Sequence, residues 1–312
     1  MKMTYWILLG AAAVLLLAAT FADLPAAQAL YNPSIKFGRL LSTAFIAPVL
    51  VLMPMSVGIL FGVLIKKTTT LGVVLRIVAP LLVVFGVFAV VEETHGFHGG
   101  GYIPFRFFVY IAVSVFLLAT VLGAYSSRKY TKPALTASIV GIIAVSGGFM
   151  LLGIFNDIWG RQSFNSMDNP AAQFTVWYEP QFPSEQKSAN MGEKINSFPS
   201  VQSFAAISIL WVAMFVNFLG FCQKNEKMWA NIITVIALCF FVFSSAIQLM
   251  TGKHFLSDIA ASAIIFLVMY MVSNAIFNDN NFRIRSNAPR RKVTADKQTG
   301  KRRVAKNKNK QK

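Results

Sequence analysis

Eight long apolar segments constrain the fold of this chain more than any other feature. They lie at residues 5–21, 41–65, 71–91, 103–125, 134–155, 200–221, 228–250 and 255–277. Most are close to the roughly 20 residues that a helix needs to cross the hydrocarbon layer of a membrane. The runs are continuous rather than alternating, which favours helices over strands. The sequence therefore predicts an all-α, polytopic membrane bundle of about eight transmembrane helices.

The composition agrees with this fold class. Of the 312 residues, 55% are hydrophobic and 13% are charged, and the mean hydropathy is +0.58. A soluble domain carries roughly 25% charged residues, so a soluble enzyme is excluded. The 28 Phe, 8 Tyr and 5 Trp residues exclude a disordered chain.

The positive charge is concentrated in the last residues. Residues 280–312 hold 13 Lys or Arg and one acid, Asp296, within a chain whose net charge is +17. We expect two parts: a transmembrane domain at 1–279 and a basic, disordered cytoplasmic tail at 280–312. The tail is expected to bind anionic inner-leaflet lipids, although it could equally be a plain determinant of topology. Eight membrane segments argue against a nucleic-acid partner.

Basic residues also follow every second apolar segment. They lie at 66–67, 128–132 and 224–227, whereas the intervening loops hold acids such as Asp23, Glu92, Glu93 and Asp168. Because basic loops mark the cytoplasmic side, both termini are predicted to be cytoplasmic and the long loop 156–199 to lie outside. Lys2 and the small residues at 26–29 would also suit a signal peptide. The loop charges favour a retained anchor.

The turn before the last segment holds the most informative histidine, His254. Asp258 follows four residues later, and on a helix these positions share a face, so the carboxylate could accept a hydrogen bond from the imidazole. That bond would raise the basicity of the outer ring nitrogen. The alternative is an ordinary helix start, in which Asp258 and Ser257 satisfy the first backbone amides.

Two other polar clusters are predicted on the same membrane face. One is 156–161, at the end of the fifth segment, and the other is 197–206, at the start of the sixth. Together with the turn at 251–258 they place polar groups at the ends of three helices. Convergence at one membrane depth would build a site for a phosphate headgroup.

These clusters resemble the three motifs of the PAP2 superfamily (type 2 phosphatidic acid phosphatases), K-x6-R-P, P-S-G-H and S-R-x5-H-x3-D. The stretches 23–33 and 147–161 are similar to the bacterial lipid A 1-phosphatase branch, and the resemblance covers most of 20–277. It implies a PAP2-like core that hydrolyses a lipid-linked phosphate or diphosphate, of lipid A or polyprenyl type. It also implies the outer face of the bacterial inner membrane, and no cofactor or metal.

The resemblance assigns roles residue by residue. His254 matches the family's nucleophile, Asp258 its orienting acid, and Arg161 an additional arginine common in the family. The other candidate phosphate-binding residues supply neutral hydrogen bonds, and they are Ser200, Gln202, Ser203 and Gln248.

The positions that depart from the motifs are ones that the family uses for acid catalysis and phosphate binding. Gln202 replaces the general-acid histidine and Gln248 an arginine, while Asn156 and Ser163 stand where the family has Lys and Arg. A positioned general acid contributes about 10²–10⁴-fold, so a second hypothesis is a catalytically inactive lipid-phosphate-binding or envelope-assembly protein. A transporter is disfavoured because the segments contain neither paired intramembrane carboxylates nor a repeat.

Two further features of the outer loops stay open. His95 and His98, near Glu92 and Glu93, could hold a divalent metal, supply the missing proton donor, or simply form a polar turn, which we favour. The aromatic residues of the long loop could stack on a sugar or anchor at the interface, and we favour anchoring for Phe174, Trp177 and Tyr178.

The charge pattern makes a direct prediction about topology. In a background with Cys222 and Cys239 replaced, single cysteines at 165–190 should react with an impermeant thiol reagent added outside. Cysteines at 128–131 should react only after the membrane is permeabilised. The reverse labelling pattern would remove the candidate site from the outer face.

Overall fold

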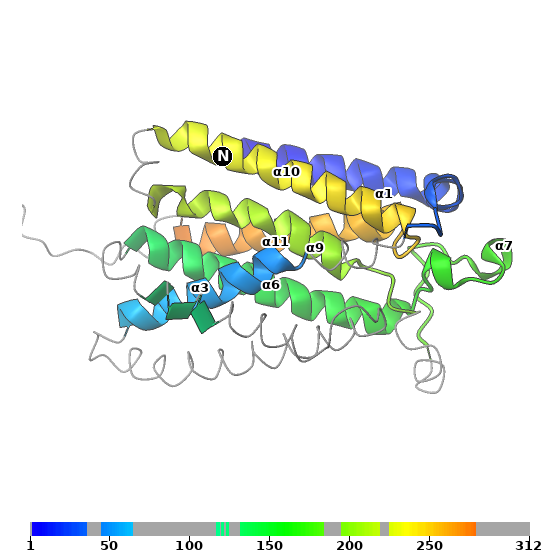
Figure 1. Cartoon of the computed structure of the whole chain (residues 1–312), viewed down its shortest axis with the longest axis horizontal. Coiled ribbons are helices and arrows are strands. Elements are labelled where there is room, and N and C mark those ends of the chain that lie inside the picture. The colour runs from blue at the N-terminus through cyan, green and yellow to red at the C-terminus, as the bar shows by residue number, and fades with distance from the viewer. Residues whose placement is uncertain are drawn as a thin grey trace, which may run out of the picture. The chain divides into compact units, whose positions relative to one another are not determined.

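The computed structural model describes residues 2–35, 45–64, 117–118, 120–121, 123–124, 132–183, 195–218 and 225–278. Within these ranges all regular structure is helical, as predicted, and the long helices run side by side (Figure 1). The long elements are α1 (Lys2–Leu30), α3 (Ala47–Leu64), α6 (Lys132–Trp159), α10 (Glu226–Met250) and α11 (Leu256–Asn278). The shorter ones are η2 (Phe164–Ser166), α7 (Pro170–Gln173), α9 (Val201–Ser208) and η4 (Ile209–Phe218).

Four of the described helical spans are long and apolar enough to cross a membrane. They are Met3–Leu30, Ala134–Ser166, Lys227–Met250 and Leu256–Phe277. Shorter apolar helices lie at Val51–Leu60 and Val201–Phe215. The predicted segment 71–91 and most of 103–125 lie outside the described residues, as does the tail 280–312. The membrane class is therefore supported, and the number of eight crossings stays a prediction.

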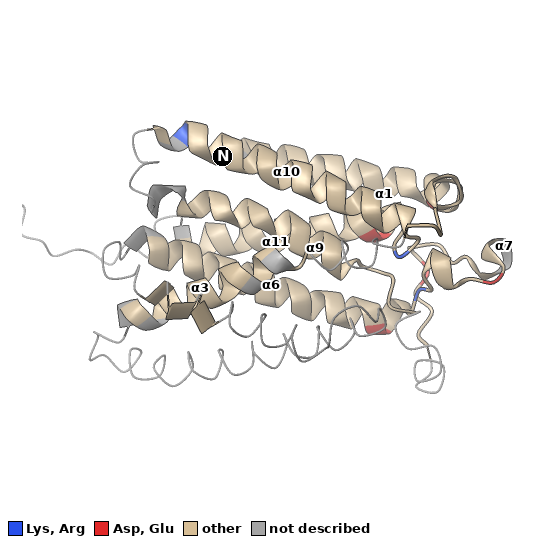
Figure 2. Cartoon of the chain, viewed as in Figure 1, with Lys and Arg blue, Asp and Glu red and all other residues tan. Residues whose placement is uncertain are grey.

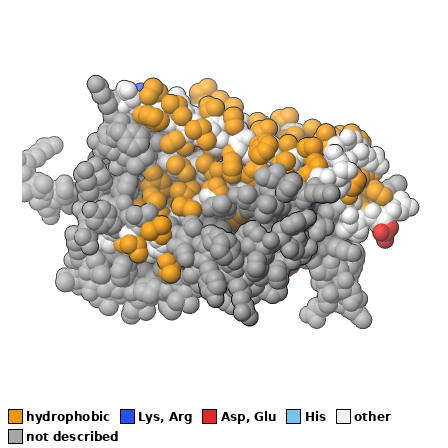
Figure 3. All heavy atoms as spheres, viewed as in Figure 1, with side chains coloured by type: hydrophobic (Ala, Val, Ile, Leu, Met, Phe, Trp, Pro, Cys, Tyr) orange, Lys and Arg blue, Asp and Glu red, His pale blue; other side chains and the backbone are white. Residues whose placement is uncertain are grey.

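The outer surfaces of these helices suit a lipid environment. Large apolar side chains are exposed along α1 and α10, among them Trp6, Leu17, Phe21, Val235 and Val242. Figure 3 shows such side chains gathered over the described part of one face. Charged residues drawn in Figure 2 lie near helix ends, and several gather at the end of the bundle where α7 lies. This distribution keeps charges away from the hydrocarbon layer.

The core forms where α11 packs against α1 and α6. Helix α3 also packs on α6, while α10 packs on α9 and η4. Tyr5 of α1 and Tyr270 of α11 meet in this core, with ring centroids 4.9 Å apart. The large buried side chains of this cluster include Phe204, Leu210, Trp211 and Phe266.

Two segments differ from the sequence-based expectation. Helix α1 continues to Leu30, so Asp23 is a buried helical residue rather than part of a loop. The predicted sixth helix changes from α to 3₁₀ winding at Ile209. The 3₁₀ stretch includes Trp211, whose indole Nε1 donates to the Ala137 carbonyl oxygen of α6 over 2.7 Å.

The helix directions bring five helix ends together at one end of the bundle. Helices α1, α6 and α10 end there, whereas α9 and α11 begin there (Figure 1). Hydrogen bonds described below join these ends directly. The three polar clusters of the sequence therefore meet in one region.

The close approach of Trp211 to α6 predicts the result of a small substitution. A Cβ atom on Gly141 would lie 1.6 Å from Trp211 Cε2, whereas one on Gly153 of the same helix meets nothing within 4 Å. Gly141→Ala should destabilise the protein by about 1–3 kcal/mol because the core is overpacked. Gly153→Ala is the matched control and should be neutral or slightly stabilising. Thermal unfolding in detergent measures both, and equal melting temperatures would contradict the packing described.

Candidate functional site

His254 lies in the turn between α10 and α11 and is 3% exposed. Its Nδ1 atom is 2.8 Å from the backbone oxygen of Ser197, and its Nε2 atom is 2.8 Å from Oε1 of Gln202. The polar clusters at 197–206 and 251–258 are therefore in direct contact. The imidazole is held from both sides.

The contact with Ser197 determines the tautomer of a neutral His254. A carbonyl oxygen only accepts hydrogen bonds, so Nδ1 must carry the proton and Nε2 the lone pair. In a neutral ring, Gln202 can bond to Nε2 only through its NH₂ group. This requires the two ends of the Gln202 amide to exchange places, which is consistent with the way these ends are assigned from their partners. The nitrogen suited to nucleophilic attack is thus the one that Gln202 covers.

Asp258 does not accept the predicted hydrogen bond from His254. The distance from Nδ1 to Asp258 Oδ2 is 3.7 Å. Helical i, i+4 geometry does not apply, because α11 begins at Leu256, after His254. Oδ2 instead accepts hydrogen bonds from Ser197 Oγ at 2.5 Å and from the Phe255 backbone N–H at 2.7 Å. The second of these is the reach-back contact of a capping box.

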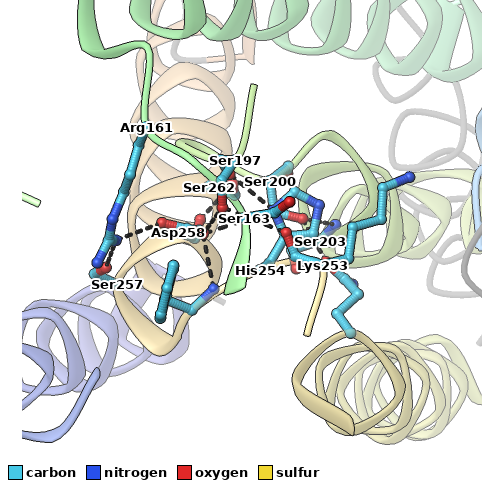
Figure 4. Close-up of polar contacts among 12 residues, drawn as sticks. Arg161, Ser163, Ser197, Ser200, Ser203, Lys253, His254, Ser257, Asp258 and Ser262 are labelled. Atoms are coloured by element: carbon cyan, nitrogen blue, oxygen red, sulfur yellow. Dashed lines mark hydrogen bonds and ion pairs between the residues drawn. The ribbon is translucent and has the colours of Figure 1, made fainter. Parts of the chain in front are cut away.

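Arg161 forms the electrostatic centre of the cluster. Its Nη1 donates to Asp258 Oδ1 at 2.7 Å and to Ser257 Oγ at 2.6 Å, and its Nη2 donates to Asp23 Oδ2 at 2.9 Å. Figure 4 shows Arg161 directed toward Ser257 and Asp258, on the far side of Asp258 from Ser203. The guanidinium also lies over the rings of Phe255 and Phe174, with Cζ 4.1 and 5.2 Å from their centroids.

With both carboxylates ionised and His254 neutral, the cluster of Arg161, Asp23 and Asp258 carries a net charge of −1. Arg161 is 1% exposed, Asp23 2% and Asp258 0%. One buried cation therefore faces two buried carboxylates. Buried ions need partners of this kind, since each uncompensated charge costs several kcal/mol.

Gln248 lies at the centre of a separate, neutral network. Its Oε1 accepts from Ser200 Oγ at 2.5 Å and Ser203 Oγ at 3.1 Å, and its Nε2 donates to the hydroxyl and carbonyl oxygens of Ser244. All four hydrogen-bonding positions of this fully buried amide are filled. The network joins α9 to α10, and Ser262 of α11 donates to the Ser200 backbone oxygen at 2.7 Å.

The two positions that match the family's K-x6-R-P motif, Ser163 and Asn156, differ in their local contacts. Ser163 donates to Asn165 Oδ1 at 2.9 Å and to Ser166 Oγ at 3.0 Å. Asn156 Oδ1 is buried and has no hydrogen-bond partner among the described residues. His95 and His98 lie outside the described residues.

The sequence reasoning missed several members of the cluster. Asp23 was assigned to a loop, although an acid inside an apolar segment is itself a signal of a buried partner. Ser197 and Ser257 carried no such signal, since serine is common at helix starts. Phe174 covers Arg161, and Trp177 donates to Thr20 Oγ1 of α1 at 3.1 Å.

Comparison with known proteins supports the resemblance in part. A model of the PAP2 superfamily matches residues 166–282. The matched range contains the His254 and Gln248 networks and excludes Asp23 and Arg161. Searches of curated proteins and of solved structures gave no match. The match supports a PAP2 assignment for this part of the chain, whereas closeness to lipid A phosphatases stays a prediction.

The ion pair predicts a large effect on stability. Arg161→Met should cost about 3–5 kcal/mol, because it leaves two buried carboxylates without a cation. Adding Asp23→Asn to this variant should recover part of the loss. Lys227→Met, which removes an exposed cation at the start of α10, is the control and should stay within about 0.5 kcal/mol. Unfolding in detergent tests this, and a fully stable Arg161→Met protein would contradict it.

Proposed function

We propose that this chain is a PAP2-type membrane phosphatase that acts on a lipid-linked phosphate or diphosphate through His254. The observation that carries the proposal is the 2.8 Å contact between His254 Nδ1 and the Ser197 carbonyl oxygen, which in a neutral ring takes the Nδ1 proton and leaves the lone pair on Nε2. The PAP2 match over 166–282 and the apolar helices support a membrane phosphatase-like protein. The bacterial inner membrane and its outer face follow from the resemblance and the loop charges.

The proposed reaction proceeds in two steps. The Nε2 lone pair attacks phosphorus, and the bond to the leaving oxygen breaks with its electron pair on that oxygen. Water then attacks phospho-His254, which releases inorganic phosphate and a proton and restores the imidazole. Asp258, 3.7 Å from Nδ1, favours the positive charge that the ring gains, while Ser197 holds its orientation.

Gln202 determines which substrates suit this site. It must leave Nε2 before phosphorus can approach, and its amide can donate a hydrogen bond but cannot protonate a leaving group. A lipid diphosphate loses a lipid monophosphate, which departs without much protonation. A simple phosphate monoester loses an alkoxide, which needs an acid. The proposed substrate class is therefore the diphosphate.

A second candidate is a non-catalytic lipid-phosphate-binding or envelope-assembly protein. It is favoured by the engagement of Arg161 with Asp23 and Asp258 and by the filled hydrogen bonds of Gln248. Removing one donor to a transition-state oxyanion can cost roughly 10²–10³-fold in rate. The rate losses from several missing donors do not simply multiply, because the residues of one active site act together.

Phosphate release by the purified protein tests these proposals. With a panel of lipid diphosphates and monoesters, we expect release from diphosphates that disappears in His254→Ala. Thr251→Ala, in the same turn but outside the His254 contacts, is the control and should keep the rate. Release that persists in His254→Ala would exclude the histidine mechanism, and no release from any substrate would favour the non-catalytic candidate.

Restoring a histidine at position 202 extends the same test. Gln202→His should raise monoester turnover more than diphosphate turnover, because only the monoester needs the acid. An equal rise for both substrate classes would contradict the role proposed for position 202.

A further inference from the structure

The carboxylate of Asp23 is bound as an anionic ligand would be. Its Oδ1 accepts the Ser257 backbone N–H at 2.9 Å, and its Oδ2 accepts Arg161 Nη2 at 2.9 Å and the Ser257 hydroxyl. None of these donors belongs to α1. The carboxylate of α1 therefore accepts hydrogen bonds only from two other parts of the chain, Arg161 after α6 and Ser257 in α11.

The donors form a site suited to an oxyanion. Ser257 is the second residue of the 23-residue helix α11, so its N–H has no partner within the helix. This N–H is part of the positive end of the helix dipole. Arg161 adds a formal positive charge. Its Nε is buried without a hydrogen-bond partner in the described part of the chain, so the guanidinium has one N–H donor that is not used there.

We propose that Arg161 and the first turn of α11 at Ser257 form an oxyanion-binding site, and that Asp23 is its resident internal anion. The site would bind a carboxylate or phosphate group that offers at least two acceptor oxygens. In this state the Asp23 carboxylate occupies Arg161 Nη2 and the Ser257 backbone N–H. The proposal concerns binding alone, so it holds or fails independently of hydrolysis.

Replacing Asp23 with alanine would change both the net charge of the cluster and the volume next to Arg161. Asp23→Ala deletes one of two carboxylates and leaves Arg161 paired with Asp258. It also vacates the volume of a carboxylate beside three donors. A small free anion can then replace the missing group, whereas in the wild-type protein the position is filled.

Anion-dependent melting of the full-length protein in detergent tests the proposal. Asp23→Ala should melt below the wild type, and sodium formate at tenfold excess over its Kd should raise its melting temperature by roughly 3 °C. The wild type should not respond. Sodium chloride at equal ionic strength should have no effect, and inorganic phosphate in place of formate tests whether the site also takes a tetrahedral anion.

Three matched variants define the response. Asp23→Asn keeps the side-chain volume and should not respond to formate. Asp157→Ala removes an exposed acid at the end of α6 and should not respond either. Asp23→Ala combined with Arg161→Met should lose the response, because the cation of the site is gone.

Several results would overturn the proposal. They are an equal rise in the wild type or in Asp23→Asn, an equal effect of chloride, and a response that survives Arg161→Met. Failure of Asp23→Ala to fold with formate present would also overturn it, since a free anion could then not replace the carboxylate. Folding only in formate would support it.

Discussion

The buried guanidinium of Arg161 is the interaction on which the rest of the candidate site depends. A cation at 1% exposure is stable only with partners, and two carboxylates and a hydroxyl supply them. These partners come from α1 and α11, whereas Arg161 follows α6. One side chain thereby fixes the relative positions of three helix ends, and Phe174 and Phe255 shield it from water.

The state of His254 follows from that ion pair. Because Arg161 holds Oδ1 of Asp258, while the Ser197 hydroxyl and the Phe255 backbone N–H hold Oδ2, the carboxylate has no short contact left for the imidazole. Ser197 instead offers its backbone oxygen to Nδ1. The same serine thus contacts Asp258 through its hydroxyl and His254 through its carbonyl. The imidazole remains oriented, although by a neutral group rather than a charged one.

The sequence could predict the helical class, the four apolar spans found among the described residues and the meeting of three polar clusters, because continuous apolar runs and loop charges report directly on membrane segments. It could not predict the partner of Asp23, since 138 residues separate it from Arg161. It also predicted a hydrogen bond between His254 and Asp258, whereas these side chains lie 3.7 Å apart, because four-residue spacing gives hydrogen-bond geometry only when both residues lie inside the helix. The 3₁₀ winding of η4 depends on the packing of Trp211 against α6, which apolar composition does not encode.

Charge balance determines how an anionic lipid can engage this region. Neutral donors such as Gln202 can bind a phosphate oxygen, with roughly 1.5–3 kcal/mol for each hydrogen bond to a charged group. A net negative cluster of Arg161, Asp23 and Asp258 opposes the same approach from a few ångströms away. An anion that displaces the Asp23 carboxylate from Arg161 would instead keep the guanidinium compensated, but it would leave Asp23 to be solvated elsewhere. Asp23 of α1 is therefore linked to His254 electrostatically through Arg161 and Asp258, although α1 supplies no hydrogen bond to the imidazole.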